Sequence, residues 1–122
     1  MPILDVQLVG PVAEGDRATL ARRIADAAGA VFASRPQQTW VTLRLIADDE
    51  YSENGGGLGG GVRPVIVSVL HVDPPTGDAL IEQVARLTHA IAQACGRSPE
   101  NVHLIYQPVA KGRTAFGGRL VG

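Results

Sequence analysis

This sequence has few aromatic residues, a single cysteine and almost no net charge. Aromatics make up 4% of its 122 residues, and Cys95 is its single cysteine, so no disulfide can form within the chain. The net charge is −1, from 11 basic and 12 acidic residues, which argues against a dedicated nucleic-acid surface. Because the start also lacks a signal-peptide pattern, we expect a reducing compartment, the cytoplasm.

Long apolar runs are missing as well. No run reaches the length that a membrane-spanning helix needs, so no membrane partner is predicted. Apolar residues nevertheless make up 45% of a 12.8 kDa chain, which is typical of a folded protein with its own core. We therefore predict a single domain over residues 1–122.

The first half of the chain alternates strand, helix and strand. Residues 2–9 are mostly apolar and precede a Gly-Pro breaker, which indicates a short strand. Asp16 is the candidate N-cap of a helix over residues 17–34, whose apolar positions share one face. Residues 40–46 then alternate in the manner of a half-buried strand.

The second half shows the same order of elements. Residues 64–72 predict a strand rich in β-branched side chains. A helix follows, capped by Thr76 or Asp78 and ended by Gly96. Residues 101–107 predict the last strand, and the remainder is interpreted as a glycine-containing tail.

The two halves repeat at a fixed interval. Pro64 follows Pro2 by 62 residues, and Gly117 follows Gly55 by the same distance. A shared period of this kind indicates an internal duplication. The repeats would cover about residues 1–56 and 63–118, with a glycine-rich linker between them.

The repeat predicts an α/β fold in which two tandem βαβ units form a four-stranded mixed sheet. Each strand–helix–strand crossover gives a parallel pair, and both helices cover one face. Parallel sheets are normally covered on both faces, so we expect other subunits to bury the second face. The residues predicted on that open face are Trp40, Thr42, Arg44, His103, Ile105 and Gln107.

Several possible site motifs favour a structural interpretation. The stretch Gly55–Gly60 contains G-x-G-x-x-G, but a strand follows it, whereas the dinucleotide motif needs a helix. His71, His89 and His103 lack ligand spacing, so no metal site is predicted. Cys95 lies at a helix end among apolar neighbours and is expected to belong to the core.

A proline after the initiator Met, a duplicated βαβ unit and a terminal Gly-Gly turn together resemble the tautomerase superfamily. Residues 98–105 (SPENVHLI) are similar to the final strand of its 4-oxalocrotonate tautomerase branch, and residues 110–120 (AKGRTAFGGRL) to that branch's C-terminal turn. Residues 36–56 carry a looser copy. The resemblance covers nearly the whole chain and implies a fused form of two family-length units. It also implies a homotrimer, as in the macrophage migration inhibitory factor branch.

The resemblance implies that Pro2 is the general base of a cofactor-independent keto–enol tautomerase or isomerase. Its substrates would be small unsaturated 2-keto or 2-hydroxy acids. Removal of Met1 would expose a secondary amine, and burial or nearby cations would lower its pKa. Pro64, an internal tertiary amide, cannot do the same. If Met1 is retained, Pro2 is an amide too, and the alternative is a non-catalytic binding or assembly protein of the same fold.

Five further residues are candidates for substrate binding. Arg44, Arg113, His103 and Tyr51 are candidates for stabilising an enolate and holding a carboxylate. Trp40 either stacks on an unsaturated substrate or fills a subunit interface. Arg44 is equally suited to an ion pair, and Arg113 and Tyr51 to a solvated surface.

Some arginines of known relatives are missing from the sequence. The pair that clamps dicarboxylates and the pair that chloroacrylate dehalogenases use both lack counterparts here. We therefore expect a different or promiscuous substrate. A hydratase or dehalogenase-like relative that acts on small unsaturated acids is the other enzymatic alternative.

Overall fold

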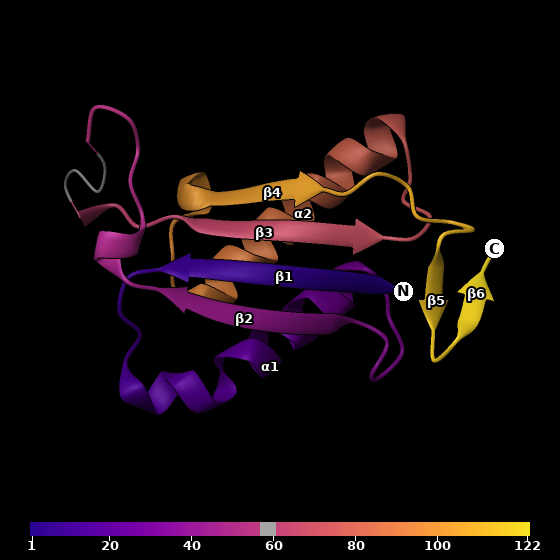
Figure 1. The fold of residues 1–122 in the computed structure, drawn as a ribbon, viewed down its shortest axis with the longest axis horizontal. Helices are drawn as coiled ribbons and strands as arrows, with labels where there is room; N and C mark the ends of the chain where they lie inside the picture. Colours follow the sequence, from indigo (N-terminus) through magenta and orange to yellow (C-terminus); the bar gives the residue numbers. More distant parts are fainter. Residues whose placement is uncertain (57–60) are drawn as a thin grey trace.

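The centre of the protein is a mixed sheet of four strands. A computed structural model describes residues 1–56 and 61–122, so most of the predicted linker lies outside the described residues. The sheet has the order β2-β1-β3-β4 (Figure 1). Its strands are β1 (Pro2–Val9), β2 (Trp40–Ile46), β3 (Val65–His71) and β4 (Val102–Tyr106).

The pairing of the strands confirms the predicted fold. β1 runs parallel to β2, and β3 runs parallel to β4, as each βαβ unit requires. The two units join through β1 and β3, which are antiparallel. The antiparallel join places the start of β1 beside the end of β3, at the end of the sheet away from Pro64.

Both helices cover one face of the sheet. α1 (Glu14–Val31) and α2 (Gly77–Cys95) lie behind the strands in Figure 1. The predicted end of α2 is confirmed, since Gly96 takes a left-handed φ of 66° that favours glycine. None of the described helices is long and apolar enough to cross a bilayer.

The predicted start of the first helix was wrong. α1 begins at Glu14, with Ala13 as its N-cap, and ends at Val31, three residues before the predicted end. The amide of Asp16 donates to the Ala13 carbonyl at 2.9 Å and closes the first turn. The Asp16 carboxylate therefore lies inside the first turn, where it complements the positive end of the helix dipole.

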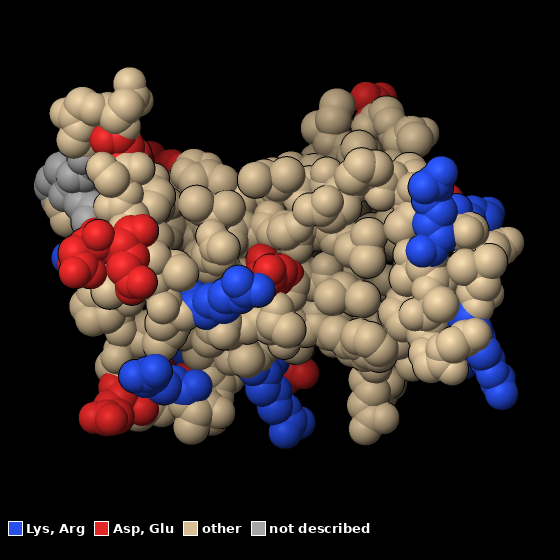
Figure 2. All heavy atoms as spheres, viewed as in Figure 1, with Lys and Arg blue, Asp and Glu red and all other residues tan. Residues whose placement is uncertain are grey.

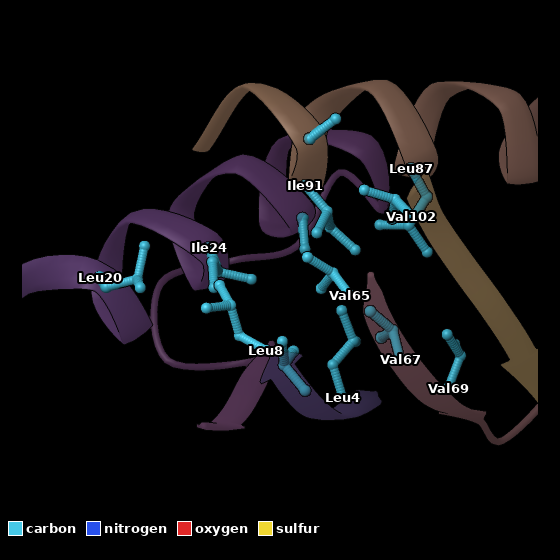
Figure 3. Packing of buried hydrophobic residues seen from close by; sticks show 13 residues of the cluster. Leu4, Leu8, Leu20, Ile24, Val65, Val67, Val69, Leu87, Ile91 and Val102 are labelled. Carbon is cyan, nitrogen blue, oxygen red and sulfur yellow. The ribbon is translucent and has the colours of Figure 1, made fainter. Parts of the chain in front are cut away.

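The core fills the space between the sheet and the helices (Figure 3). Strand side chains alternate, so every second residue of β1 and β3 points at the helices. Apolar area removed from water drives this packing at about 25 cal/mol per Å². The fully buried residues include Leu4, Leu8, Leu20, Ile24, Val65, Val67, Val69, Leu87 and Ile91.

The opposite face of the sheet is uncovered, as predicted. Trp40 is 43% exposed and Ile105 57% exposed on it. Most of the surface in this view carries neither basic nor acidic side chains (Figure 2). A shallow cavity of about 250 Å³ opens over the middle of the strands, between Gln7, Ser68 and Gln107.

The C-terminal segment, predicted as a glycine-containing tail with a Gly-Gly turn, has the turn and is a β-hairpin. β5 (Thr114–Phe116) and β6 (Arg119–Val121) pair antiparallel beside the start of β1 (Figure 1). Gly117 and Gly118 form the turn with φ of 60° and 84°. Both values are positive, which is the backbone that a tight two-residue hairpin requires and that glycine adopts readily.

Two isoleucines of α2 that differ in solvent exposure provide a test of the core packing. Ile91 is fully buried, whereas Ile81 is 69% exposed. Ile91→Ala should lower the free energy of unfolding by about 2–5 kcal/mol, because it removes buried methyl groups and leaves a cavity. Ile81→Ala should stay within about 0.5 kcal/mol of wild type. Urea unfolding at one fixed protein concentration checks both; equal losses would contradict this packing.

Candidate active site

Pro2 lies at the start of the inner strand β1, at the end of the sheet where several segments meet. It is buried, and its ring lies on the helix-covered face with Leu4. In the antiparallel pair its partner is His71, the last residue of β3. Side chains of such directly opposed residues lie about 4.5–5.5 Å apart at their Cβ atoms. The strand pairing therefore places an imidazole beside the residue that was predicted to be catalytic.

His71 is held between the two helices. Its ring meets that of Phe32 edge-on, with centroids 5.1 Å apart, at the end of α1. Burial lowers the pKa of His71, and the positive terminal amine lowers it further. Hydrogen bonding to the Gln83 side chain and the charge of Asp73 act in the opposite direction. The balance keeps this imidazole neutral to a lower pH than an ordinary histidine.

A second polar contact near His71 joins β4 to α2. The Tyr106 hydroxyl donates to Gln83 Oε1 at 2.7 Å. Burial raises the pKa of Tyr106, so its hydroxyl keeps its proton at neutral pH. His71, Gln83 and Tyr106 thus form a neutral polar group at the Pro2 end, supplied by β3, α2 and β4.

The C-terminal hairpin adds aromatic surface at the same end. Trp40 pairs with Ile3 of β1, and its ring meets Phe116 of β5 edge-on with centroids 5.4 Å apart. The Trp40 indole Nε1 donates to the Gln37 carbonyl at 2.9 Å. Arg113, another predicted substrate-binding residue, is exposed just before β5. Trp40 and the segment that carries Arg113 therefore belong to the Pro2 end.

Arg44 lies on the open face, farther along β2. Its guanidinium is 3.6 Å from the Asp5 carboxylate, which also accepts a hydrogen bond from Thr42 at 2.9 Å. Exposed ion pairs of this kind contribute about 0–1 kcal/mol. Within one chain Arg44 thus has the ion-pair role that the sequence left open as an alternative.

Tyr51 and His103 lie away from Pro2 within the chain. Tyr51 follows β2 and donates to Glu53 at 2.6 Å, a hydrogen bond that raises the pKa of its hydroxyl. His103 is exposed on β4 opposite Ile66, near the start of β3. A single chain does not bring either side chain to the Pro2 end, so their substrate role stays a prediction.

The other end of the sheet, around Pro64, is closed by arginine contacts. Arg63 makes two hydrogen bonds to Asp48, at 2.8 and 2.9 Å, and these bonds lower the pKa of the carboxyl. Arg97 donates to the carbonyls of Val9 and Arg63 at 3.0 and 2.8 Å. A cavity of about 400 Å³ lies beside both arginines. These contacts join the two halves where the duplicated proline is an amide.

The described residues show no arrangement suited to a metal ion. Within residues 1–56 and 61–122, no three His, Cys, Asp or Glu side chains converge as ligands. Cys95 is packed against the core, and burial raises its pKa to about 11, which keeps it as the thiol. The side-chain chemistry at the Pro2 end therefore consists of acid–base and hydrogen-bonding groups.

Sequence reasoning missed the residues that surround Pro2 most closely. His71 was considered only as a metal ligand, and Phe32, Gln83 and Tyr106 were not considered for the site. They meet because β1 and β3 pair antiparallel, a long-range contact that no local pattern predicts. The one available signal was the 62-residue repeat, which places the two first strands in equivalent positions.

Comparison with solved structures identifies known proteins of the same fold. No protein-family model matches the sequence, and no curated protein matches it. Several solved structures are similar to this chain. One is a wild-type fused 4-OT, described as a symmetric trimer, with a TM-score of 0.77 and 15% sequence identity. The match covers 98% of this chain and 94% of that one. A protein called Pt0534, inactivated by 2-oxo-3-pentynoate, has a TM-score of 0.72 at 15% identity over 98% and 94%.

A macrophage migration inhibitory factor homologue from Prochlorococcus marinus is similar as well. Its TM-score is 0.71 at 13% identity, over 98% of this chain and 99% of that one. At identities this low the likeness concerns the fold. The chain has the tautomerase fold, as the resemblance in its sequence implied.

The hairpin contact can be tested through the single tryptophan. Phe116→Ala should remove the edge-on ring from Trp40, shift its fluorescence to longer wavelength and increase quenching by acrylamide. Leu120→Ala, on the exposed strand of the same hairpin, is the control and should leave the spectrum unchanged. If both variants match wild type, the hairpin does not pack beside β1 in solution.

Proposed function

We propose that this protein is a cofactor-independent tautomerase of small unsaturated 2-keto or 2-hydroxy acids, with Pro2 as its general base. The observation that carries the proposal is the position of Pro2. It is a buried proline at the first position after Met1, beside a neutral imidazole, in a tautomerase fold.

The chemistry requires a free terminal nitrogen. Removal of Met1 converts the Pro2 nitrogen from an amide to a secondary amine. That amine takes a proton from the carbon next to a carbonyl and returns it elsewhere on the resulting enol or dienol. The developing negative oxygen needs hydrogen-bond donors or cations nearby. Arg113 and the Tyr106 hydroxyl are the candidates that lie toward this end.

The substrate class is supported by one of the similar structures. Pt0534 is described as inactivated by 2-oxo-3-pentynoate, which is itself an unsaturated 2-keto acid. Trp40 and Phe116 offer apolar ring surface beside β1 for an unsaturated or aromatic substituent. An aryl pyruvate is therefore a suitable first substrate.

We also propose that the chain assembles as a homotrimer through the open face of the sheet. The fused 4-OT of the same fold is described as a trimer. Ile105, more than half exposed, lies on this largely uncharged face, and aromatic and apolar side chains are typical of interface centres. A neighbouring chain would also bring its own side chains toward the Pro2 end.

The two prolines of the repeat form a matched pair for testing the base. Pro2→Ala should lower the rate of enol–keto conversion of an aryl pyruvate by about 10²–10⁴-fold, the usual contribution of a positioned base. Pro64→Ala is the control, because the nitrogen at that position is an amide in either case. A stopped-flow assay of the conversion, with circular dichroism as a check on folding, measures both variants.

A third variant separates the nitrogen from the ring. Inserting a lysine between Met1 and Pro2 prevents removal of Met1 and keeps Pro2 as an amide. This chain should fold normally and be as inactive as Pro2→Ala, and intact mass confirms its start. Equal turnover by wild type and Pro2→Ala would contradict Pro2 as the base, and no turnover by either would favour the alternative of a non-catalytic protein with the same fold.

The assembly can be tested with two exposed isoleucines. Ile105→Arg places a charge on the open face and should convert the trimer to monomers, because a buried unpaired charge is costly. Ile81→Arg, on the exposed side of α2, should leave the trimer intact. Light scattering after size-exclusion chromatography gives the mass; a wild-type monomer would contradict the proposal.

A further inference from the structure

One buried polar atom at the Pro2 end has no partner. Among the described residues, no group donates a hydrogen bond to His71 Nδ1 or accepts one from it, although that atom is fully buried. A buried polar group without a partner costs about 1–3 kcal/mol. Orphaned groups of this kind are few in native structures, and a catalytic role is one of the explanations for them.

The proton position on the ring determines whether Nδ1 can accept. The Gln83 side chain, which accepts a hydrogen bond from Tyr106 at 2.7 Å, raises the pKa of His71. A neutral imidazole carries its proton on one nitrogen and a lone pair on the other. With the proton on Nε2, the buried and unpartnered Nδ1 has the free lone pair that a proton acceptor needs.

We propose that His71 is a second proton-transfer residue, whose Nδ1 accepts the hydroxyl proton of an enol bound against Pro2. This inference rests on the proposed function and adds to it the partner of the base. Pro2 and His71 are directly opposed in the strand pair and share the helix-covered face, so an enol bound at the Pro2 nitrogen would lie next to the imidazole. Met1 is half-buried next to Pro2, and its removal takes a side chain away from this end.

The step balances without any further reactant. In ketonisation the protonated Pro2 amine gives its proton to the enol carbon, and a new C–H bond forms. The electrons of the C=C bond make that C–H bond, the O–H bond breaks, its electrons form the C=O bond, and the hydroxyl proton moves to Nδ1. The pair begins with one positive charge on Pro2 and ends with it on His71. Proton exchange with solvent then restores the starting state.

The charges around His71 suit this starting state. The terminal amine of Met1 precedes β1, Asp73 follows β3, and Tyr106 of β4 donates to Gln83. Lys111 is 3.3 Å from Asp73 and offsets its charge. Two neighbouring positive charges are disfavoured, so a protonated amine selects a neutral imidazole. Uptake of the hydroxyl proton by Nδ1 then becomes favourable only as the amine loses its own.

The pH dependence of turnover gives the first test. As pH falls through the lowered pKa of His71, Nδ1 is protonated and can no longer accept. The rate should therefore fall on an acid limb below about 6.5, the ordinary histidine value. His71→Gln should lower kcat for ketonisation of phenylpyruvate enol by about 10²-fold and abolish this limb. His89→Gln, at an exposed histidine of α2, is the control and should keep the wild-type profile.

Two further measurements keep the test decisive. His71→Phe retains a ring against Phe32 and lacks both nitrogens, so it should show the same loss if the glutamine variant folds poorly. Long-range ¹⁵N NMR of the Met-free protein at pH 7 should show Nε2 protonated and Nδ1 bare. An Nδ1–H tautomer, or an unchanged kcat and acid limb in both variants, would overturn the role of His71. If Pro2→Ala is then still inactive, the proposed function survives this failure; if Pro2→Ala is fully active, both fail.

Discussion

The antiparallel pairing of β1 with β3 is the constraint on which the rest of the structure depends. It is the join between two βαβ units, and its helix-facing residues are the centre of the core. Val6 lies opposite Val67, and Leu4 opposite Val69, all fully buried. A slip of one residue would turn these side chains to the open face, so the register is strongly specified. The same register sets Pro2 opposite His71 at the end of the pair.

The duplication places an equivalent proline at each end of the sheet. The two ends differ chemically because Pro2 is next to the first residue, whereas Pro64 is in the middle of the chain. At one end Pro2 is next to the terminus, among an aromatic pair and a neutral polar group. At the other end Pro64 is an internal amide, where Arg63 and Arg97 bind a carboxylate and main-chain carbonyls. Only the first end can present a free amine. The second end instead connects the halves, with Gly10 packed so closely under Arg63 that a side chain would clash.

Local pattern was enough to predict most of the fold, because each strand and helix carries its own periodicity. The 62-residue interval then led to the duplicated architecture, and the place of Pro2 after Met1, with the resemblance to the tautomerase superfamily, led to the candidate base. What local pattern could not supply was contact between distant segments, and so His71, Gln83 and Tyr106 were missed. The turn at Gly117 and Gly118 was predicted, but the two strands that flank it were missed, since they have three residues each, too short to show alternation.

The neutrality of the Pro2 end bears on how a carboxylate substrate is held. Within the described part of the chain, Arg44 is paired with Asp5, Arg63 with Asp48, and Lys111 with Asp73. Among the described residues, the polar side chains placed around Pro2 are an imidazole, an amide and a phenol, and none of them is a free cation. Under the proposed function the substrate carboxylate therefore needs Arg113 of the hairpin or a cation from a neighbouring chain. One protomer would then supply all the groups that transfer protons. The cation that binds the substrate carboxylate would come from the hairpin or from a neighbouring chain.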